Sequence, residues 1–538
     1  MSNAKRFGVM LDMSRNAVMK PDEVKNFARI LKSFGYNMIQ LYTEDTFEVE
    51  NEPYFGYMRG RYTMGEIRDI VDYCEGIGVE VIPCVQTLAH LNQIFRWKEY
   101  KAINDATDIL MAGEDRTYTL VDNIFKTIKS CFKTDRVHIG MDEAHFIGLG
   151  KYLAKNGYRN RVDILSEHLA KVIEIAKKYD LKCIMWSDMF FRLAGYPGYY
   201  TLDKDGITDE IVKKCPNGVE LVYWDYYNSK EYYDNMIDQH KKFGRDVWFA
   251  GGAWTWRGFA PFNWFSIKTM SDAMQSCSER GIENIFFTMW GDDGKECSFY
   301  AVLPSLFAIR KVYDGITDMD EIKRLFKEAT GEDYDTMMAL DSPNLIGGAT
   351  DAKTNISKIM LYNDPLFGVF DSTVKEGVAE EFFECSKKLS ALAKESTYSY
   401  IFEFEAALCE LLSHKYDLGA RTRTAYESGD KTALKALLGE YDKVSELLEK
   451  FHDKFRTLWY KENKPHGFDV QEIRLGGLML RVRTCKERIE DYINGKIDKL
   501  EELEEKLLDV HGGGEELSKE LPFINSWQKS ASVNVMSW

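Results

Sequence analysis

The sequence predicts an α/β protein in which a (β/α)8 barrel is followed by an all-α C-terminal domain. Three observations predict this fold class. Up to about residue 300, short apolar segments alternate with helix-like stretches of roughly twenty-five to forty residues. Eight such segments can be counted, and their C-terminal ends carry polar or aromatic residues. From about Asp351 the apolar residues recur instead at helical spacing, with charged residues between them.

The eight segments have the composition of buried parallel strands, and the crossover helices between them favour a closed barrel. They read FGVMLDMSR from Phe7, NMIQLYTED from Asn37, VEVIPCVQT from Val79, RVHIGMDEA from Arg136, KCIMWSDMF from Lys182, ELVYWDYY from Glu220, DVWFAGGAW from Asp246 and NIFFTMWGDD from Asn284. An open doubly wound sheet is the alternative. Against it, no glycine-rich phosphate loop follows the first segment, and the sequence contains no G-x-x-x-x-G-K-[ST] motif.

The fourth segment shows the alternation that a barrel strand requires. Val137, Ile139 and Met141 share one face, which we expect to meet the helices. His138, Gly140 and Asp142 share the other face, which we expect to point into the barrel. The polar residues gather at C-terminal strand ends, where barrel enzymes hold their active sites.

The change of pattern after the eighth segment predicts two domains, a barrel over residues 5–345 and a helical domain over residues 351–538. Residues Gly347 to Ala349 form the expected linker. Three long runs predict helices: FEFEAALCELLSHKYDL, LKALLGEYDKVSELLEKFHDKF and ERIEDYINGKIDKLEELEEKLLDV. The charged residues from Lys499 to Lys506 are interpreted as a solvated helix face, with a coiled-coil seam as the alternative.

Composition limits the classes of function. The formal net charge of −16 and the pI near 5.3 oppose binding to nucleic acid or to an anionic membrane surface. The ten cysteines include no Cys-x-x-Cys pair, so neither a zinc ribbon nor a disulfide framework is expected. No segment has the apolar length of a signal peptide or a membrane span. We therefore expect a cytoplasmic protein with reduced thiols.

The strongest chemical signal is the segment from His138 to Glu143, which places Asp142 and Glu143 side by side at a strand end. Two adjacent carboxylates at a barrel mouth repel each other, and the loss of solvation raises the pKa of at least one, which suits it to donate a proton. Glu143 is the candidate acid. A conventional retaining glycosidase needs carboxyl groups about 5 Å apart on opposite sides of the sugar. Neighbours in sequence reach it from one side, so a second strand or the substrate itself must supply the nucleophile.

These residues resemble a known family. The His-x-Gly-x-Asp-Glu pattern on the fourth strand is similar to the signature of glycoside hydrolase family 20, the β-N-acetylhexosaminidases. The resemblance extends over the barrel and is strengthened by Trp186 on the fifth strand and by Trp290-Gly291-Asp292 on the eighth. The whole chain resembles the bacterial subgroup that begins directly at the barrel and ends in a helical domain.

The resemblance implies substrate-assisted catalysis without a metal or other cofactor. The 2-acetamido oxygen of a terminal N-acetylhexosamine would attack its own anomeric carbon and form an oxazolinium ion. Asp142 would orient and stabilise the acetamido group. Glu143 would protonate the leaving oxygen and later activate water. The expected substrates are N-acetylhexosamine-terminated oligosaccharides, and the choice between N-acetylglucosamine and N-acetylgalactosamine stays open.

The resemblance also implies sugar contacts. Arg15 matches the arginine that grips the outer hydroxyls, and Tyr226 is chosen from a tyrosine cluster as donor to the acetamido oxygen. Asp292 replaces the glutamate usual at its position, which shortens the reach of its carboxylate. The remaining candidates for the same pocket are Glu44, His90, Trp186, Trp224, Trp254 and Trp290.

Two other readings remain. A metal-dependent hydrolase would use His138, Asp142 and His145, with His90 added from another strand. A non-catalytic sugar-binding protein would keep the aromatic residues and would not need the acid pair. The amphipathic helices exceed what one barrel needs, which makes a homodimer possible. The segment from Leu458 to Gly477 is interrupted by Pro465-His466-Gly467, and a lid or a subunit contact is a hypothesis for this loop.

Overall fold

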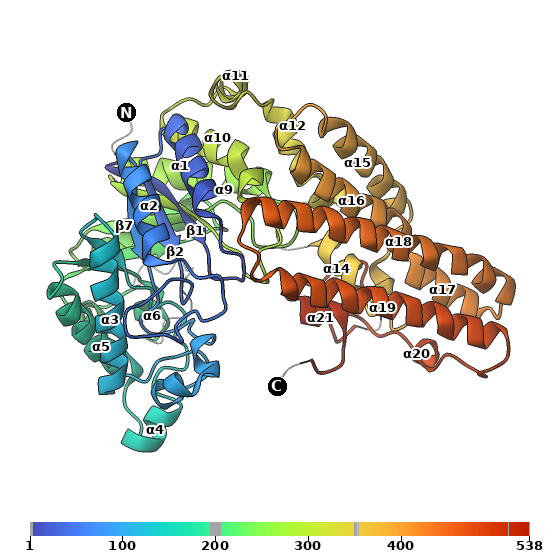
Figure 1. Ribbon diagram of the computed structural model, residues 1–538, viewed down its shortest axis with the longest axis horizontal. Helices are drawn as coiled ribbons and strands as arrows, with labels where there is room; N and C mark the ends of the chain where they lie inside the picture. Colours follow the sequence, from blue (N-terminus) through green and yellow to red (C-terminus); the bar gives the residue numbers. More distant parts are fainter. Residues whose placement is uncertain are drawn as a thin grey trace. The chain divides into compact units, whose positions relative to one another are not determined.

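The computed structural model describes residues 4–193, 199, 206–348, 352, 355–514 and 516–536, which form two compact units (Figure 1). The first unit comprises residues 1–253, 266–290 and 305–330. The second comprises residues 254–265, 291–304 and 331–538. The second unit therefore contains two loops, those that follow the seventh and eighth strands, in addition to the C-terminal helices. The predicted domain boundary between residues 345 and 351 stays a prediction, and Ala349 and Asp351 lie outside the described residues.

Eight parallel strands close into a barrel in the order in which they occur along the chain. They are β1 (Arg6–Asp12), β2 (Met38–Tyr42), β3 (Glu80–Cys84), β4 (Arg136–His138), β5 (Lys182–Trp186), β6 (Val219–Trp224), β7 (Val247–Gly252) and β8 (Asn284–Met289). The last strand pairs with the first in register, with Arg6 opposite Asn284. Each strand matches one of the eight predicted segments, with β1 and β6 beginning one residue earlier than the segment, so the predicted fold class is confirmed.

The helices that follow the strands begin and end at local sequence signals. The sequence places Pro21 at the start of α1, and Gly35 ends that helix with φ 96°. Thr63 and Glu66 form a reciprocal capping box at the start of α2. The helices of this part of the chain are α1 (Pro21–Phe34), α2 (Met64–Gly76), α3 (Asp115–Cys131), α4 (Lys151–Asn156), α5 (Arg161–Lys177), α6 (Asp188–Arg192), α7 (Asp209–Lys214), α8 (Lys230–Lys241), α9 (Asn263–Glu279), α10 (Leu303–Tyr313) and α11 (Met319–Thr330).

Apolar and aromatic side chains from alternate strand positions fill the barrel interior. They form one buried cluster of Met10, Met38, Tyr42, Ile82, Cys84, Ile184, Trp186, Val222, Trp248, Ala250 and Phe286. The ring of His138 lies 4.5 Å from that of Trp186 and 6.5 Å from that of Phe286, so His138 points into the barrel as predicted. Trp224 and Trp290 pack against the end of this cluster.

The fourth strand ends earlier than its sequence pattern suggests. It stops at His138, and the alternation does not continue to Asp142 because Gly140 and Met141 adopt φ 70° and 71°. A Cβ atom on Gly140 would come within 2.1 Å of Gln86 Oε1, so a larger residue would displace the Gln86 side chain and strain the backbone. The motif is therefore a tight turn, and this turn rather than the strand delivers Asp142.

The second unit is predominantly helical, as predicted. Its helices are α12 (Tyr334–Met338), α13 (Ser342–Leu345), α14 (Ile356–Tyr362), α15 (Val378–Leu392), α16 (Ser399–Lys415), α17 (Leu418–Glu427), α18 (Lys431–Glu462), α19 (Phe468–Ile493), α20 (Glu501–Glu504) and α21 (Trp527–Ala531). Short 3-10 turns in the two units are Ile94–Arg96, Lys98–Ile103, Phe299–Val302, Ala339–Asp341, Ile346–Gly348 and Asp371–Thr373. The long helices α18 and α19 lie side by side (Figure 1), joined by the loop that contains Pro465.

The third long run predicted as helix is broken. Helix α19 ends at Ile493 because Gly495 takes φ 70° and the Lys496 N–H bonds back to the carbonyl of Asp491 at 2.8 Å. In the rest of that run, up to Val510, only Glu501–Glu504 is helical, with Leu503 buried. The expectation of one continuous helix through the charged run was therefore wrong.

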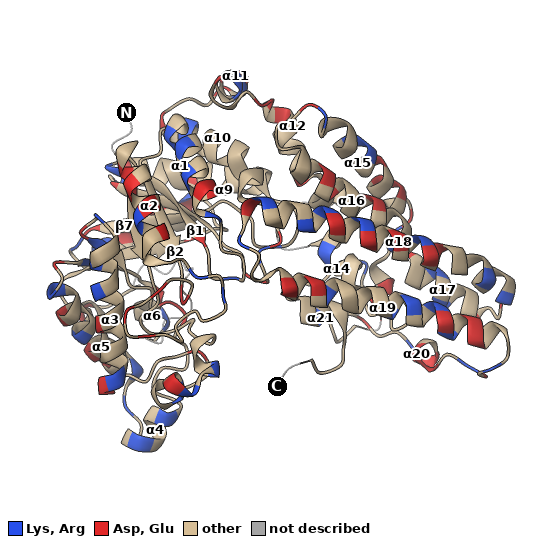
Figure 2. Ribbon diagram, in the orientation of Figure 1, with Lys and Arg blue, Asp and Glu red and all other residues tan. Residues whose placement is uncertain are grey.

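Acidic and basic residues are interspersed along α18 and α19 (Figure 2). Within the described ranges, no helix combines the length and the apolar character needed to cross a bilayer.

Candidate active site

The residues predicted to bind and cleave a sugar follow the C-terminal ends of the barrel strands. In a parallel barrel these ends share one rim. Arg15 follows β1, Glu44 follows β2 and His90 lies beyond β3. Asp142 and Glu143 follow β4. Trp186 and Trp224 are the last residues of β5 and β6, and Tyr226 and Trp290 lie just beyond β6 and β8.

Asp142 is buried and held by two partners from the segment after β3. Gln86 Nε2 donates to Asp142 Oδ1 at 2.8 Å, and His90 Nε2 lies 3.2 Å from Oδ2. Burial alone would raise the pKa of Asp142, but the charge of His90 and the hydrogen bond from Gln86 outweigh it and lower the pKa. The expected effect of desolvation is thus reversed at Asp142, which is held as a carboxylate.

Gln86 also sets the turn that carries Asp142. Its Oε1 accepts the backbone N–H of Met141 at 3.1 Å, while its Nε2 contacts the Tyr42 hydroxyl at 3.0 Å. One side chain therefore fixes both the backbone and the carboxylate of the acid motif.

Glu143 has a different environment from its neighbour. Its side chain is 45% exposed, and its Oε2 lies 3.8 Å from His90 Nε2. Its backbone has φ 52°, and its N–H donates to Asp188 Oδ2 at 3.2 Å. A non-glycine residue in this region is strained, and such strain gathers at functional sites. The pair thus consists of one enclosed and one accessible carboxyl group.

His90 is charged in this setting. Burial lowers its pKa, but the carboxylate of Asp142 and, to a smaller extent, that of Glu44 raise it to about 10. The His90 backbone has φ 57°, and its N–H donates to Asp108 Oδ2 at 2.9 Å. The imidazolium therefore lies between the acid pair and Glu44. The hydrogen bond from its backbone N–H to Asp108 holds the residue in place.

We expect the stability conferred by His90 to depend on pH. Its pKa is about 10 in the folded protein against an ordinary 6.5, so its contribution is complete below about pH 6.5 and is lost as the pH rises through about 10. Urea unfolding of wild type and His90→Gln should therefore give a larger difference in unfolding free energy at about pH 6 than at about pH 10. His511→Gln, at an exposed position, is the control. A difference that stays constant over this range would mean that the imidazole is neutral.

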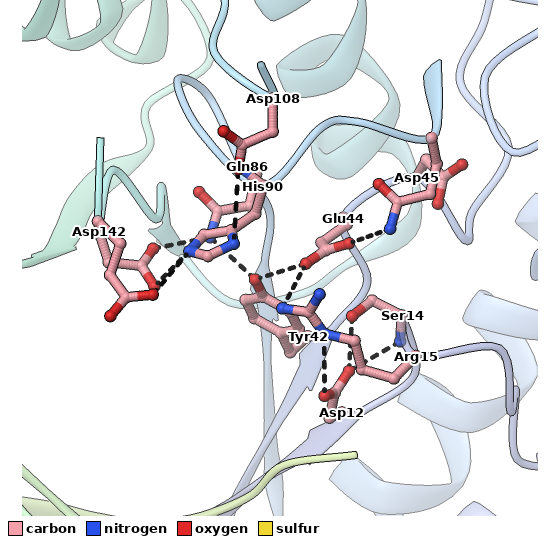
Figure 3. A network of polar contacts seen from close by, with 12 residues as sticks. Asp12, Ser14, Arg15, Tyr42, Glu44, Asp45, Gln86, His90, Asp108 and Asp142 are labelled. Carbon is pink, nitrogen blue, oxygen red and sulfur yellow. Dashed lines mark hydrogen bonds and ion pairs between the residues drawn. The ribbon is translucent and has the colours of Figure 1, made fainter. Parts of the chain in front are cut away.

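A chain of polar contacts links Arg15 to Asp142 (Figure 3). Arg15 Nη2 lies 3.2 Å from Glu44 Oε1, and the Tyr42 hydroxyl donates to the same oxygen at 3.0 Å. The Gln86 side chain connects Tyr42 to Asp142. Burial raises the pKa of Glu44, and the Arg15 guanidinium offsets part of this rise. Three predicted residues, Arg15, Glu44 and His90, thus belong to one network with Asp142.

The predicted aromatic residues of the barrel also contact one another. The rings of Trp186 and Trp290 lie 6.1 Å apart, and Tyr42 meets Trp290 edge-on at 4.8 Å. Trp290 Nε1 donates to the Tyr226 hydroxyl at 3.0 Å, and the rings of Trp224 and Tyr226 are 5.4 Å apart. Within the described residues, the buried indole N–H of Trp186 has no hydrogen-bond acceptor. Such a wall suits a ligand with an apolar face and one acceptor group.

Trp254 and Asp292 belong to the second unit. Trp254 stacks on Trp256 at 4.3 Å with an interplanar angle of 25°. Asp292 is exposed on the loop after β8, where it accepts a hydrogen bond from Asn525 Nδ2 at 3.4 Å.

Sequence reasoning did not include three residues that support the predicted set, Tyr42, Gln86 and Asp188. Asp188 is buried, and besides the Glu143 N–H its Oδ2 accepts Arg192 Nε at 3.0 Å. Burial, followed by the charge of Asp142, raises the pKa of Asp188 to about 7. All three occur at or just after strand ends, which is the signal that could have found them.

The alternative metal site is not assembled. In the described part of the chain, no group of three or more His, Cys, Asp or Glu side chains is arranged to hold a metal ion. His138 is enclosed in the barrel, and burial lowers its pKa to about 3, while His145 is exposed.

Models of known protein families match both the barrel and the helical part of the chain. The model described as "Glycosyl hydrolase family 20, catalytic domain" matches residues 6–239, and "Glycoside Hydrolase 20C C-terminal domain" matches residues 333–521. Beta-hexosaminidase 1 of Coccidioides posadasii is 23% identical over 218 residues, which are 34% of this chain and 36% of that protein. Hexosaminidase D of Bos taurus is 22% identical over 248 residues, which are 43% of this chain and 64% of that protein.

Among solved structures, the beta-N-acetylhexosaminidase from Bacteroides fragilis is 18% identical, with a TM-score of 0.47 over 60% of this chain and 70% of that chain. The GH20 exo beta-N-acetylglucosaminidase from Vibrio harveyi is 15% identical, with a TM-score of 0.47 over 63% of this chain and 58% of that chain. The chain spans 36% and 64% of the length of the two curated relatives named above. The two family models match the barrel and the helical segment that follows it, and so confirm the resemblance first seen in the His-x-Gly-x-Asp-Glu motif: the chain belongs to glycoside hydrolase family 20.

Proposed function

We propose that this protein is an exo-acting, retaining β-N-acetylhexosaminidase that works by substrate-assisted catalysis. The observation that carries the proposal is the contrast within the acid pair. Asp142 is buried and kept ionised by His90 and Gln86, whereas the next residue, Glu143, is 45% exposed. One carboxylate can therefore stabilise positive charge while the other exchanges protons with substrate and water.

In the first step, the carbonyl oxygen of the substrate's 2-acetamido group attacks the anomeric carbon, and the bond to the leaving oxygen breaks. Glu143 gives its proton to that oxygen. Asp142 accepts the acetamido N–H and stabilises the positive charge that develops on the oxazolinium ring. The fixed carboxylate needs no reorganisation, because Gln86 and His90 already hold it.

In the second step, the Glu143 carboxylate takes a proton from water, and the resulting hydroxide attacks the anomeric carbon from the side that the leaving group vacated. The ring opens, the acetamido group re-forms, and the anomeric configuration is retained. The exposure of the Glu143 side chain supports this role, because water must reach it after the first product leaves.

We assign the remaining contacts from charge and shape. Arg15 and Glu44 would bind the outer hydroxyl groups of the sugar, because a guanidinium and a carboxylate can each form hydrogen bonds with two neighbouring hydroxyl groups. Trp186, Trp224, Trp254 and Trp290 would wall the acetamido pocket, and Tyr226 would donate to the acetamido oxygen. His90 would hold Asp142, and Asp292 would contact a sugar hydroxyl. We assign catalysis to the predicted barrel domain, residues 5–345, and support to the predicted helical domain, residues 351–538.

We further infer a reducing, cytoplasmic location and a homodimer. All ten cysteines are buried free thiols, which supports a reducing compartment. Ile473 and Leu480 lie one heptad apart on α19 and are 68% and 55% exposed, which supports a subunit contact. A mass of 62.3 kDa by light scattering, the mass of one chain, would contradict the dimer.

Hydrolysis of p-nitrophenyl N-acetyl-β-glucosaminide beside p-nitrophenyl β-glucoside tests the proposed function. We expect turnover of the acetamido sugar alone, because only this substrate carries its own nucleophile. A thiazoline analogue of the oxazolinium ion should inhibit, and EDTA should have no effect.

Cleavage of the plain glucoside would contradict substrate assistance and would require a nucleophile from another strand. Loss of all activity with EDTA would favour the metal reading. Binding of N-acetylglucosamine without turnover would favour a sugar-binding protein.

A further inference from the structure

The loop after β8 is anchored within the second unit by a buried charge cluster. Lys358 Nζ lies 2.8 Å from Asp293 Oδ2 and 2.6 Å from Glu296 Oε2. Arg474 donates to the Asp293 carbonyl at 2.6 Å and to its Oδ1 at 3.1 Å. Asp293 thus binds α14 and α19, and the preceding residue, Asp292, is presented from a backbone that is held in place.

The loop after β7 is anchored in the same unit by aromatic packing. The ring of Phe259 lies 5.4 Å from that of Phe451 in α18 and 6.0 Å from that of Phe404 in α16. Five residues earlier, Trp254 stacks on Trp256. Two of the proposed sugar contacts, Trp254 and Asp292, therefore occur on loops whose conformation depends on the helical unit.

The C-terminal tail segment, residues 523–527, joins these two loops. The Arg257 guanidinium lies 4.2 Å above the ring of Phe523, and the Trp527 N–H donates to Asp293 Oδ2 at 2.6 Å. Between them, Asn525 Nδ2 donates to the carbonyl of Trp256 at 3.0 Å and to Asp292 Oδ2 at 3.4 Å. One amide group thus bonds to both loops, and the residues that it joins are 269 and 233 positions away in sequence.

We propose that Asn525 is a positioning residue for sugar recognition, which orients the Asp292 carboxylate and fixes the Trp254–Trp256 stack through the Trp256 carbonyl. This inference rests on the proposed function, in which Trp254 and Asp292 contact the sugar. It gives the tail segment a role in binding substrate, although it lies at the far end of the chain from the acid motif.

The physical reason is the short reach of Asp292. The exposed carboxylate has one fewer methylene than the glutamate expected at this position, so its direction must be set closely if it is to meet a sugar hydroxyl. A hydrogen bond from Asn525 restricts the side-chain torsions of Asp292 before substrate arrives. Less conformational entropy is then lost when the sugar binds. The same amide ties that carboxylate to the indole stack on the other loop.

Kinetics of Asn525 variants with p-nitrophenyl N-acetyl-β-glucosaminide test the inference in the full chain. Asn525→Ala should raise KM about tenfold, the loss expected for one charge-assisted hydrogen bond, and change kcat less than about threefold. Asn525→Asp should raise KM further, because the introduced carboxylate repels Asp292. Asn525→Gln keeps the donor and should recover part of the loss. The dissociation constant of N-acetylglucosamine, measured by calorimetry, should change in parallel with KM.

Asn534→Ala is the matched control, because Asn534 lies beyond the tail segment, near the same end of the chain, and its side chain bonds to the Ser532 hydroxyl. A double-mutant cycle separates positioning from loss of structure. Once Asp292→Asn has removed the carboxylate, Asn525→Ala should have at most about a third of its effect on KM. A general loosening of the tail would instead give additive effects and a lower melting temperature.

The inference is overturned if Asn525→Ala and Asn525→Asp both keep the wild-type KM and dissociation constant, or if the cycle is additive. If wild type cleaves acetamido sugars and the variants match it, only the inference fails and the proposed function stands. If wild type binds N-acetylglucosamine without cleaving it, the dissociation constants still decide the role of Asn525. If wild type neither binds nor cleaves, both fail.

Discussion

Glu143→Gln is expected to abolish cleavage of N-acetylhexosaminides with poor leaving groups, with kcat/KM lower by about 10²- to 10⁴-fold. The glutamine has nearly the same shape but has no acidic proton for the departing oxygen. Aryl glycosides whose leaving groups have a low pKa need less protonation, so the rate of their first step should fall less. Initial rates on a β-linked disaccharide and on a series of aryl N-acetyl-β-glucosaminides measure this difference.

The expected signature is a steeper dependence of kcat/KM on leaving-group pKa in the variant than in wild type. Azide, a nucleophile that needs no general base, should restore part of the turnover of activated substrates, because water activation by Glu143 is also lost. Glu174→Gln, on the exposed surface of α5, is the matched control. An unchanged slope would assign proton transfer to another group, and Asp188, with its pKa of about 7, would be tested next.

The barrel could be predicted from the sequence because its evidence is local and repeated. Each strand of a parallel barrel is buried on both faces, so the eight apolar segments stand out one by one. The positions of the strand ends were less predictable from the sequence. The fourth strand stops at His138, and just beyond it Gly140 lies close to Gln86, a residue of another strand segment. No pattern within the motif itself records that contact.

The placement of the candidate residues at strand ends was predictable from the sequence, and their electrostatics were not. The motif and the strand ends indicated Asp142, Glu143 and their neighbours. The pKa of Asp142 depends on His90 and Gln86, which follow β3 and lie beside it through the pairing of β3 with β4. At Asp142 the charge of His90, a residue distant in sequence, outweighs desolvation, and the motif alone does not reveal this neighbour.

The organisation of the second unit was also beyond sequence reasoning. Trp254 and Asp292 follow barrel strands in sequence, yet their loops pack with the helices and the tail segment. The contacts responsible, such as Phe259 with Phe451 and Asn525 with Asp292, join residues more than a hundred positions apart. Periodicity describes neighbours in sequence and carries no information on such pairs.

Asp142→Asn is expected to slow turnover of every acetamido substrate by about 10²- to 10³-fold, activated aryl glycosides included. Its carboxylate stabilises the charge that forms when the ring closes, and every leaving group departs in this same step. A neutral amide of the same size cannot do so, and it leaves the buried, protonated His90 without its counter-charge. The loss should therefore appear in kcat and depend little on leaving-group pKa, unlike that of Glu143→Gln.

The comparison of the two variants separates the roles of adjacent residues. Asp135→Asn, just before β4 and partly exposed, tests whether any loss of an aspartate near this strand has the same effect. The thiazoline inhibitor supplies an independent measure, because it mimics the closed ring and should bind the Asp142→Asn protein much more weakly than wild type. Wild-type activity of Asp142→Asn on an aryl glycoside, with unchanged thiazoline affinity, would remove Asp142 from the reaction and leave its ion pair with His90 as a purely structural contact.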